Sequence, residues 1–183
     1  DIDKNAKLPN FAKQFKENFP VNKDAPAYGK KAILFSTCYG NYHNTEIISS
    51  TYKVLRHNGI EVSLFYDGCC GMPQLEQGNL ERVAEQARKI SKKLVNLIDK
   101  DTQIIAPIPS CALMFKTEWP LLLPQDENVQ MLSRNTFDID EYIIGISENE
   151  GITKGLKPLG GDITVHMSCH SRAQNIGPKS AQM

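Results

Sequence analysis

Four of the five cysteines in the chain each follow a short apolar run of the kind that forms a buried β-strand. The runs are 31–36 (KAILFS) before Cys38, 60–66 (IEVSLFY) before Cys69 and Cys70, and 103–108 (QIIAPI) before Cys111. Cys169 repeats the arrangement after a fourth run, 162–167 (DITVHM). Parallel strands that are joined by right-handed crossovers all point their carboxyl ends the same way. We therefore expect the thiols to gather at one edge of a parallel sheet.

Gathered thiols are metal ligands. Thiolates are soft, and they select iron–sulfur clusters, zinc or copper(I) over magnesium or calcium. The alternative is that each cysteine is a small buried hydrophobic residue that happens to end a strand. That explanation suits any one of them, but the shared placement of all five favours a metal site.

The adjacent pair Cys69-Cys70, followed by Gly71, is the most specific local feature. Two vicinal thiolates do not easily reach one tetrahedral ion, but they can serve two irons of a cluster, and the glycine lets the backbone pass close by. The alternatives are a strained vicinal disulfide, or one structural thiol beside one ligand.

The chain alternates strand and helix signals from residue 31 onward, which predicts an α/β fold with a doubly wound, mostly parallel, Rossmann-like sheet. We expect helices at about 44–58, 79–100, from 112 to Trp119-Pro120, and at 138–146, and a further strand at 128–132. Phe11, Phe15 and Phe19 are spaced four apart, as in one amphipathic helix of an N-terminal arm. Trp119 is expected in the core. No GxGxxG or Walker motif is present, so nucleotide binding is poorly supported.

Composition excludes several functions. The chain has 183 residues, 21 basic and 21 acidic, and no basic stripe that would bind nucleic acid. No apolar run is long enough to span a bilayer, and the odd, low cysteine count is not that of a secreted disulfide scaffold. We therefore expect a soluble, cytoplasmic protein with reduced thiols, which could be membrane-peripheral through a partner. Both ends look cut, which suggests a fragment.

These motifs resemble a known family. Cys38, the segment 69–73 (CCGMP), the segment 109–116 (PSCALMFK) and the segment 166–174 (HMSCHSRAQ) together are similar to the cysteine-rich CCG family. That family includes the B subunit of heterodisulfide reductase, the C subunit of anaerobic glycerol-3-phosphate dehydrogenase, and iron–sulfur subunits of glycolate and lactate oxidation systems. The resemblance covers about 31–183.

The resemblance implies two tandem repeats, each of which carries one cysteine, a CCG and a closing CxxC. Residues 1–29 would be a linker or arm, 30–158 the first repeat, and 159–183 the truncated start of a second. The first cluster, of the [4Fe-4S] type, would be ligated by Cys38, Cys69, Cys70 and Cys111. In the heterodisulfide reductase subunit the corresponding cluster is non-cubane. Cys169 would open the second repeat. Met114 stands where the second cysteine of the CxxC would be, and a thioether is a poor cluster ligand.

The resemblance further implies an electron-transfer subunit of an oxidoreductase that works between a flavin-bearing or other redox partner and quinone, ferredoxin or a disulfide. No catalytic residue is assigned. Two other functions stay open at this point. One is a zinc-stabilised structural or interaction module that uses the same cysteines, and the other is thiol chemistry at an activated cysteine.

Overall fold

A four-stranded sheet forms the centre of the computed structural model, which describes residues 5, 11–155, 157 and 160–183. All strand pairs are parallel, and the strand order is β2-β1-β3-β4. The strands are β1 Lys31–Phe35, β2 Glu61–Phe65, β3 Thr102–Ala106 and β4 Thr136–Asp138. The helices are α1 Cys38–Tyr42, α2 Thr45–His57, α3 Met72–Glu76, α4 Leu80–Val95, α5 Pro109–Leu113, α6 Trp119–Leu122, α7 Glu127–Arg134, α8 Ile139–Asn149, α9 Cys169–Ala173 and α10 Lys179–Gln182.

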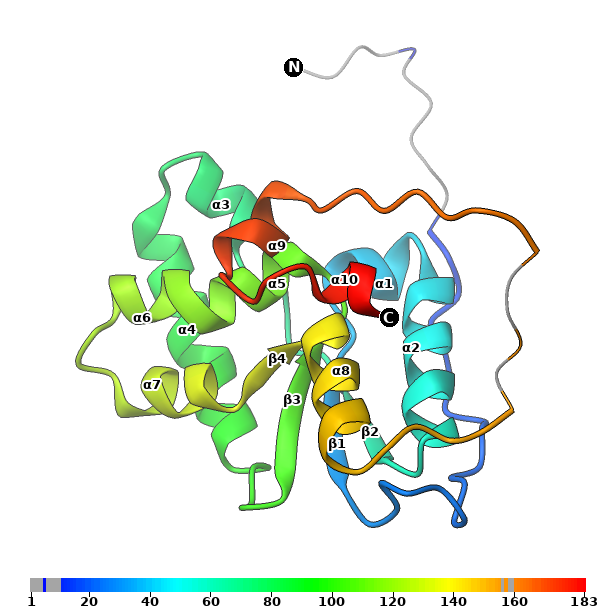
Figure 1. Ribbon diagram of the computed structural model, residues 1–183. Coiled ribbons are helices and arrows are strands. Elements are labelled where there is room, and N and C mark those ends of the chain that lie inside the picture. The colour runs from blue at the N-terminus through cyan, green and yellow to red at the C-terminus, as the bar shows by residue number, and fades with distance from the viewer. Residues whose placement is uncertain (1–4, 6–10, 156, 158–159) are drawn as a thin grey trace.

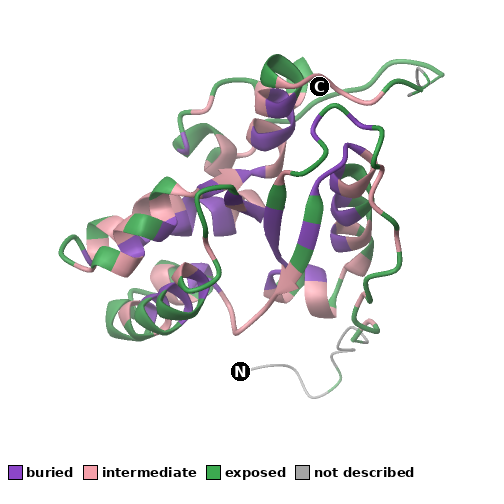
Figure 2. Ribbon diagram, turned by 90° about the horizontal axis from the view of Figure 1, so that it is seen from below, coloured by how far each residue is buried: buried purple, intermediate pink, exposed green. Residues whose placement is uncertain are grey.

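Helices cover both faces of the sheet, as Figure 1 shows. Alternate residues of β1 point to opposite faces: Ile33 and Phe35 join one hydrophobic cluster with α4 to α7, and Ala32 and Leu34 join another with α2 and α8. In Figure 2 the buried colour covers most of β1 and β3 and the inward side of the surrounding helices, whereas the edge strand β2 also carries exposed residues. This arrangement confirms the predicted doubly wound α/β fold.

The strand order places a topological switch point between β1 and β3. The chain leaves β1 toward β2 on one side, and later returns to add β3 on the other side. Open α/β sheets bind ligands in the crevice at such a point, outside the carboxyl ends of the strands. The cysteine-bearing turns after β1, β2 and β3 all lie at that edge.

The predicted N-terminal helix is wrong, because the described residues 11–22 contain no helix. The phenylalanines still serve as anchors: Phe15 and Phe19 pack on the cluster that contains Leu34 and Tyr52. The arm also covers the edge strand, since the Glu17 carboxylate accepts a hydrogen bond from the Leu64 backbone N–H at 3.0 Å. Tertiary packing fixes this segment without regular structure.

Two predicted strands are also wrong. Residues 128–132 lie inside helix α7, because Asp126 caps it by accepting from the N–H groups of Asn128 and Val129, and Val129 and Leu132 then bury one helical face. Residues 162–167 form no strand and are exposed, because no neighbouring strand in the described part of the chain pairs with them. The segment alternates apolar and polar residues as a strand does, but it does not pair with the sheet.

The helix that was expected to end at Trp119-Pro120 continues to Leu122. A π-helical stretch, Met114–Glu118, joins α5 to α6 and accommodates the proline. Pro120 has no N–H to give to the Lys116 carbonyl, and the Ser133 hydroxyl donates to that carbonyl instead, at 2.8 Å.

Within the described residues, no helix combines the length and the apolar character that a membrane crossing requires.

The core makes a stability prediction. Leu34 is fully buried in β1, so Leu34→Ala should lower the free energy of unfolding by about 2–5 kcal/mol through lost burial and a residual cavity. Leu121 is 72% exposed, and the same change there should cost at most about 0.5 kcal/mol. Urea denaturation of both variants measures the difference. Equal losses would contradict the assigned core.

Candidate metal centre

Cys38 is placed by the turn after β1. Thr37 adopts φ 54° and ψ 160°, an uncommon conformation for a β-branched residue, and its hydroxyl caps α1 by accepting from the Gly40 N–H at 2.9 Å. Cys38 is then the first residue of α1, with a half-buried thiol. The backbone at Thr37 is therefore strained, and this strained turn places Cys38 directly after the carboxyl end of β1.

The CCG turn follows β2. Gly68 and Gly71 flank the two cysteines with φ values of 130° and 92°, which side-chain-bearing residues rarely adopt. The Trp119 indole N–H donates to the Cys70 carbonyl at 3.0 Å and fixes the turn from the side of the core. Cys69 is half-buried and Cys70 is buried. Trp119 is in the core as predicted, but its contact with the CCG turn was not foreseen.

Cys111 lies in the first turn of α5, directly after β3. Its N–H donates to the Ile108 carbonyl at 2.9 Å, and its side chain is buried. The phenyl ring of Phe115 then packs against Phe35 of β1 and Trp119 of α6, with ring centroids 4.8 and 4.3 Å apart. Aromatic packing therefore holds α5 and the CCG turn against the same strand.

These four thiols form one interacting group. The Cys38 and Cys69 sulfurs are 3.6 Å apart, and all five cysteines are free thiols, so Cys69 and Cys70 form no disulfide. Thiol donors at Cys38 and Cys70, with the Gly71 N–H at 3.4 Å, lower the pKa of Cys69 far below its usual value. Donation to Cys69, with burial, raises the pKa of Cys38 above its usual range, and Cys111, Cys69 and burial raise that of Cys70. One thiolate thus forms readily, and further ionisation requires compensating positive charge.

Helix α4 clamps the CCG turn from outside. The Asp67 carboxylate lies 2.7 Å from the Lys93 ammonium and 3.4 Å from that of Lys89. The Gln86 amide rests against Gly68, where an added Cβ would lie only 2.1 Å from its nitrogen. The charged face of α4 therefore also fixes the loop that carries the two cysteines. In the sequence, the spacing of Gln86, Lys89 and Lys93, three and four residues apart, already indicates that they share one face of a helix.

A cavity of about 310 Å³ opens beside Cys69. It is lined by Asp67, Gly68, Cys69, Gly71, Gln74, Arg82, Gln86 and Lys89. The cavity gives small molecules a polar route to the half-buried Cys69 thiol, while Cys70 and Cys111 stay enclosed in the core.

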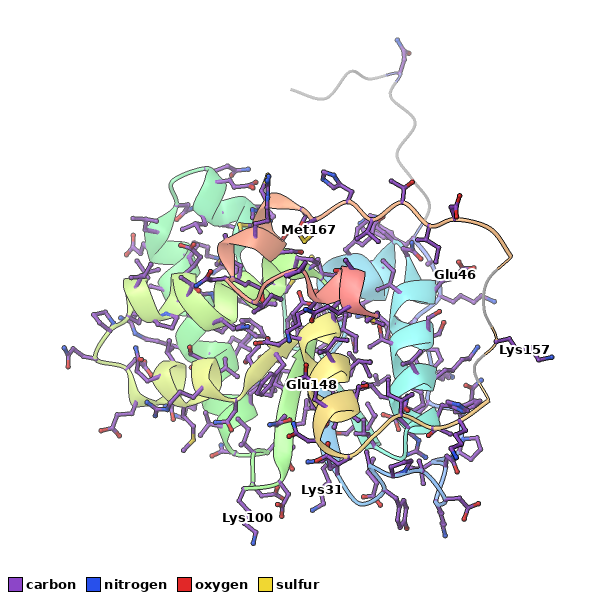
Figure 3. The ribbon with its side chains drawn as sticks, viewed as in Figure 1. Lys31, Glu46, Lys100, Glu148, Lys157 and Met167 are labelled. Atoms are coloured by element: carbon purple, nitrogen blue, oxygen red, sulfur yellow. The ribbon has the colours of Figure 1, made fainter. Side chains whose placement is uncertain are left out.

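Cys169 is placed differently. It is exposed and begins helix α9, and the residues 160–168 directly before it form no strand. Helix α9 packs on α5: the His170 Nδ1 and the Ser110 hydroxyl are 2.7 Å apart, and the Gln174 amide donates to the Pro109 carbonyl at 3.3 Å. Figure 1 shows the preceding coil crossing the molecule at the edge that carries α1 and α5. In Figure 3, Met167 labels this end of the molecule, and Lys31 and Lys100 label the opposite end.

Met114, at the position of the missing CxxC cysteine, is fully buried in the same cluster as Cys70 and Cys111. Its methyl carbon lies 3.7 Å from the point that a Cβ on Gly71 would occupy. The side chain therefore fills the space beneath the CCG turn as a packing residue.

The donor set suits an iron–sulfur cluster, because four thiols of one chain converge at one sheet edge and two of them are enclosed by apolar side chains. Among the described residues, no group of three or more histidine, cysteine, aspartate or glutamate side chains has the arrangement that would hold a single metal ion. A cluster is larger than one ion and engages thiolates over a wider span.

Fold and site together define a cysteine-rich α/β domain. Residues 32–116 match the model of the CCG family, described as a cysteine-rich domain. The predicted resemblance is thereby confirmed.

The curated relatives include three proteins named lactate utilization protein A. The one from Macrococcus caseolyticus is 30% identical over 145 residues, which cover 76% of this chain and 56% of the relative. The one from Bacillus licheniformis is 27% identical over 146 residues (76% and 58%), and that from Oceanobacillus iheyensis is 26% identical over 156 (82% and 60%). The chain thus spans less than two thirds of the length of these relatives. No solved structure matches it.

The site predicts a pH-resistant thiolate. Cys69 has a lowered pKa and is half-buried, so in the reduced, metal-free chain it should react with iodoacetamide at pH 5 nearly as fast as at pH 8. Cys70, with a raised pKa and a buried side chain, should react far more slowly at both pH values. Peptide mass spectrometry after timed alkylation compares them. Faster labelling of Cys70 would contradict the assigned thiol order.

The packing role of Met114 predicts tolerance to an apolar substitute. Met114→Leu should change the free energy of unfolding by less than about 1.5 kcal/mol and leave the iron content unchanged. Met114→Ala should lower stability by about 2–5 kcal/mol, because it opens a cavity under the CCG turn. Denaturation and iron analysis of both variants test this. Loss of iron in the stable leucine variant would instead make the thioether a ligand.

Proposed function

We propose that this chain is an iron–sulfur electron-transfer unit of a multi-component oxidoreductase. The observation that carries the proposal is the convergence of Cys38, Cys69, Cys70 and Cys111 at the switch point of a CCG-family domain. The relatives' name associates those proteins with lactate use. It favours a lactate-oxidising system over the heterodisulfide reductase and anaerobic glycerol-3-phosphate dehydrogenase types that the motifs also resemble.

A cluster bound by these cysteines would supply one-electron redox chemistry. The chain's own residues prepare the place for it. Cys70 and Cys111, which are buried, would hold it from the apolar side and exclude water, and the half-buried Cys38 and Cys69 would hold it from the side nearer to solvent. The Gly71 N–H donates to the Cys69 sulfur, and such donors stabilise thiolate charge and tune the potential of a bound cluster.

The division into an arm (1–29), a first repeat (30–158) and the start of a second (159–183) remains part of the proposal. Within it, Cys169 belongs to a second ligand set. A flavin-bearing or other redox partner, with quinone or a disulfide as the further reactant, completes the proposed assembly. The cluster is a [4Fe-4S] cluster, cubane or non-cubane.

The test is anaerobic purification of the chain, followed by analysis of iron, zinc and acid-labile sulfide and by EPR spectroscopy. We expect iron and sulfide in matching amounts, and loss of most of both in Cys69→Ser and in Cys70→Ser. Cys169→Ser is the matched control, because the thiol is exposed and the change should leave the first cluster intact.

Three outcomes would overturn the proposal. Zinc without sulfide would identify a structural module. A chain that holds no iron, zinc or sulfide after anaerobic purification would point to thiol chemistry. Iron that survives both Cys69→Ser and Cys70→Ser would place the cluster elsewhere.

A further inference from the structure

The cavity beside Cys69 contains a buried hydrogen-bond acceptor that the described part of the chain does not satisfy. Gln74 lies in α3, directly after the CCG turn, and lines the cavity of about 310 Å³. Its side-chain oxygen Oε1 is buried and has no hydrogen-bond partner among the described residues. A buried acceptor without a donor costs free energy, and native proteins satisfy nearly all of them. The cavity therefore suits a molecule that brings a donor to this oxygen.

The charges around the cavity favour an anion. Asp67, Arg82 and Lys89 line it. The Asp67 carboxylate is already compensated, because its two oxygens lie 2.7 Å from the Lys93 ammonium and 3.4 Å from that of Lys89. Arg82 pairs only with Glu85 among the described residues, at 3.1 Å and with both side chains more than half exposed. Three cations thus face two carboxylates, and this excess of positive charge attracts a further negative group.

Helix α4 holds the cationic wall in place. Arg82, Gln86 and Lys89 follow one another at intervals of four and three residues, so they share one face of this helix, and all three line the cavity. Cys69 forms part of the opposite wall, and its half-buried thiol faces whatever the cavity binds. The volume is at the lower end of the range for ligand pockets, so the ligand is small.

We propose that this cavity binds a small 2-hydroxy carboxylate, whose hydroxyl donates to Gln74 Oε1 and whose carboxylate lies against Arg82 and Lys89. A simple carboxylate would leave the Gln74 oxygen unsatisfied, and an amino acid would bring a positive ammonium group to a site with excess positive charge. The role of this ligand as a substrate of the oxidoreductase rests on the proposed function. Its binding requires only the residues of the cavity.

The test is isothermal titration calorimetry of the anaerobically purified chain, repeated on the same chain after removal of iron. The probes are L-lactate, propionate, which lacks the hydroxyl, and lactamide, which lacks the charge. L-lactate should bind about tenfold more tightly than propionate, because only the hydroxyl satisfies the buried acceptor. Lactamide should also bind more weakly than L-lactate. In the iron-free chain, saturating L-lactate should slow the alkylation of Cys69 by iodoacetamide and leave that of the exposed Cys169 unchanged.

Two variants separate the two contacts. Gln74→Met removes the acceptor at similar size, so the affinity for L-lactate should fall about tenfold, to that of propionate, whose affinity should not change. Arg82→Gln removes a positive charge, so both carboxylates should bind about two- to fivefold more weakly with the preference for L-lactate retained. Lys100→Gln is the matched control, because Lys100 is exposed and precedes β3 at the opposite edge of the sheet (Figure 3), and it should bind as wild type does.

Equal affinities of the wild-type chain for L-lactate and propionate would overturn the inference, because they are expected of a cavity that holds only water. The absence of L-lactate binding, or a preference for L-lactate that survives Gln74→Met, would also overturn it. The wild-type comparison holds even where a variant fails to fold. Failure of the proposed function gives a different result, namely a chain without iron and sulfide that still prefers L-lactate to propionate.

Discussion

The crowding of four thiols at the carboxyl edge of one parallel sheet is the constraint on which the rest of the structure depends. The order β2-β1-β3 brings the turns after three strands side by side, although their cysteines are separated by up to 73 positions in the sequence. Each thiolate disfavours ionisation of the neighbouring thiols, and burial further raises the pKa of Cys38 and of Cys70. Such a site is stable in its ionised form only with a positively charged group at its centre.

Holding the thiols in place demands local strain and several supports. Thr37 and the two CCG-flanking glycines adopt left-handed backbone conformations at the turns that carry Cys38, Cys69 and Cys70. The Trp119 indole and the Asp67–Lys93 ion pair hold the CCG turn from inside and outside. Each support comes from a different element, α6 or α4, so the helices that complete the core also fix the site. Stability of the domain and geometry of the centre are therefore coupled.

The sequence predicts the parts of this arrangement that local pattern encodes. The apolar runs before Cys38, Cys69 and Cys111 are strands, and the alternation with helices fixes the sheet as parallel and doubly wound. Local pattern fails where tertiary partners decide. Residues 162–167 alternate as a strand but have no strand beside them within the described chain, and 128–132 follow a capping aspartate that makes them helical.

The supports of the site were equally hard to foresee. The hydrogen bond from Trp119 to the Cys70 carbonyl joins residues 49 positions apart, and neither residue type by itself predicts it. Lys89 and Lys93 look like ordinary surface charges until β2 places Asp67 against them. Such contacts depend on the path of the chain in space, which periodicity and composition do not contain.

The two sides of the centre differ in a way that bears on electron transfer. Cys70 and Cys111 face the apolar cluster around Trp119, whereas Cys38 and Cys69 are only half-buried and Cys69 lines the polar cavity. A redox group held between them would be insulated on one side and accessible on the other. Helix α9 adds a third direction, because His170 and Gln174 fasten it to the turn that carries Cys111 while Cys169 points outward. A second ligand set that used Cys169 would thus be connected to the first through α5, with Ser110 and His170 as the shared contact.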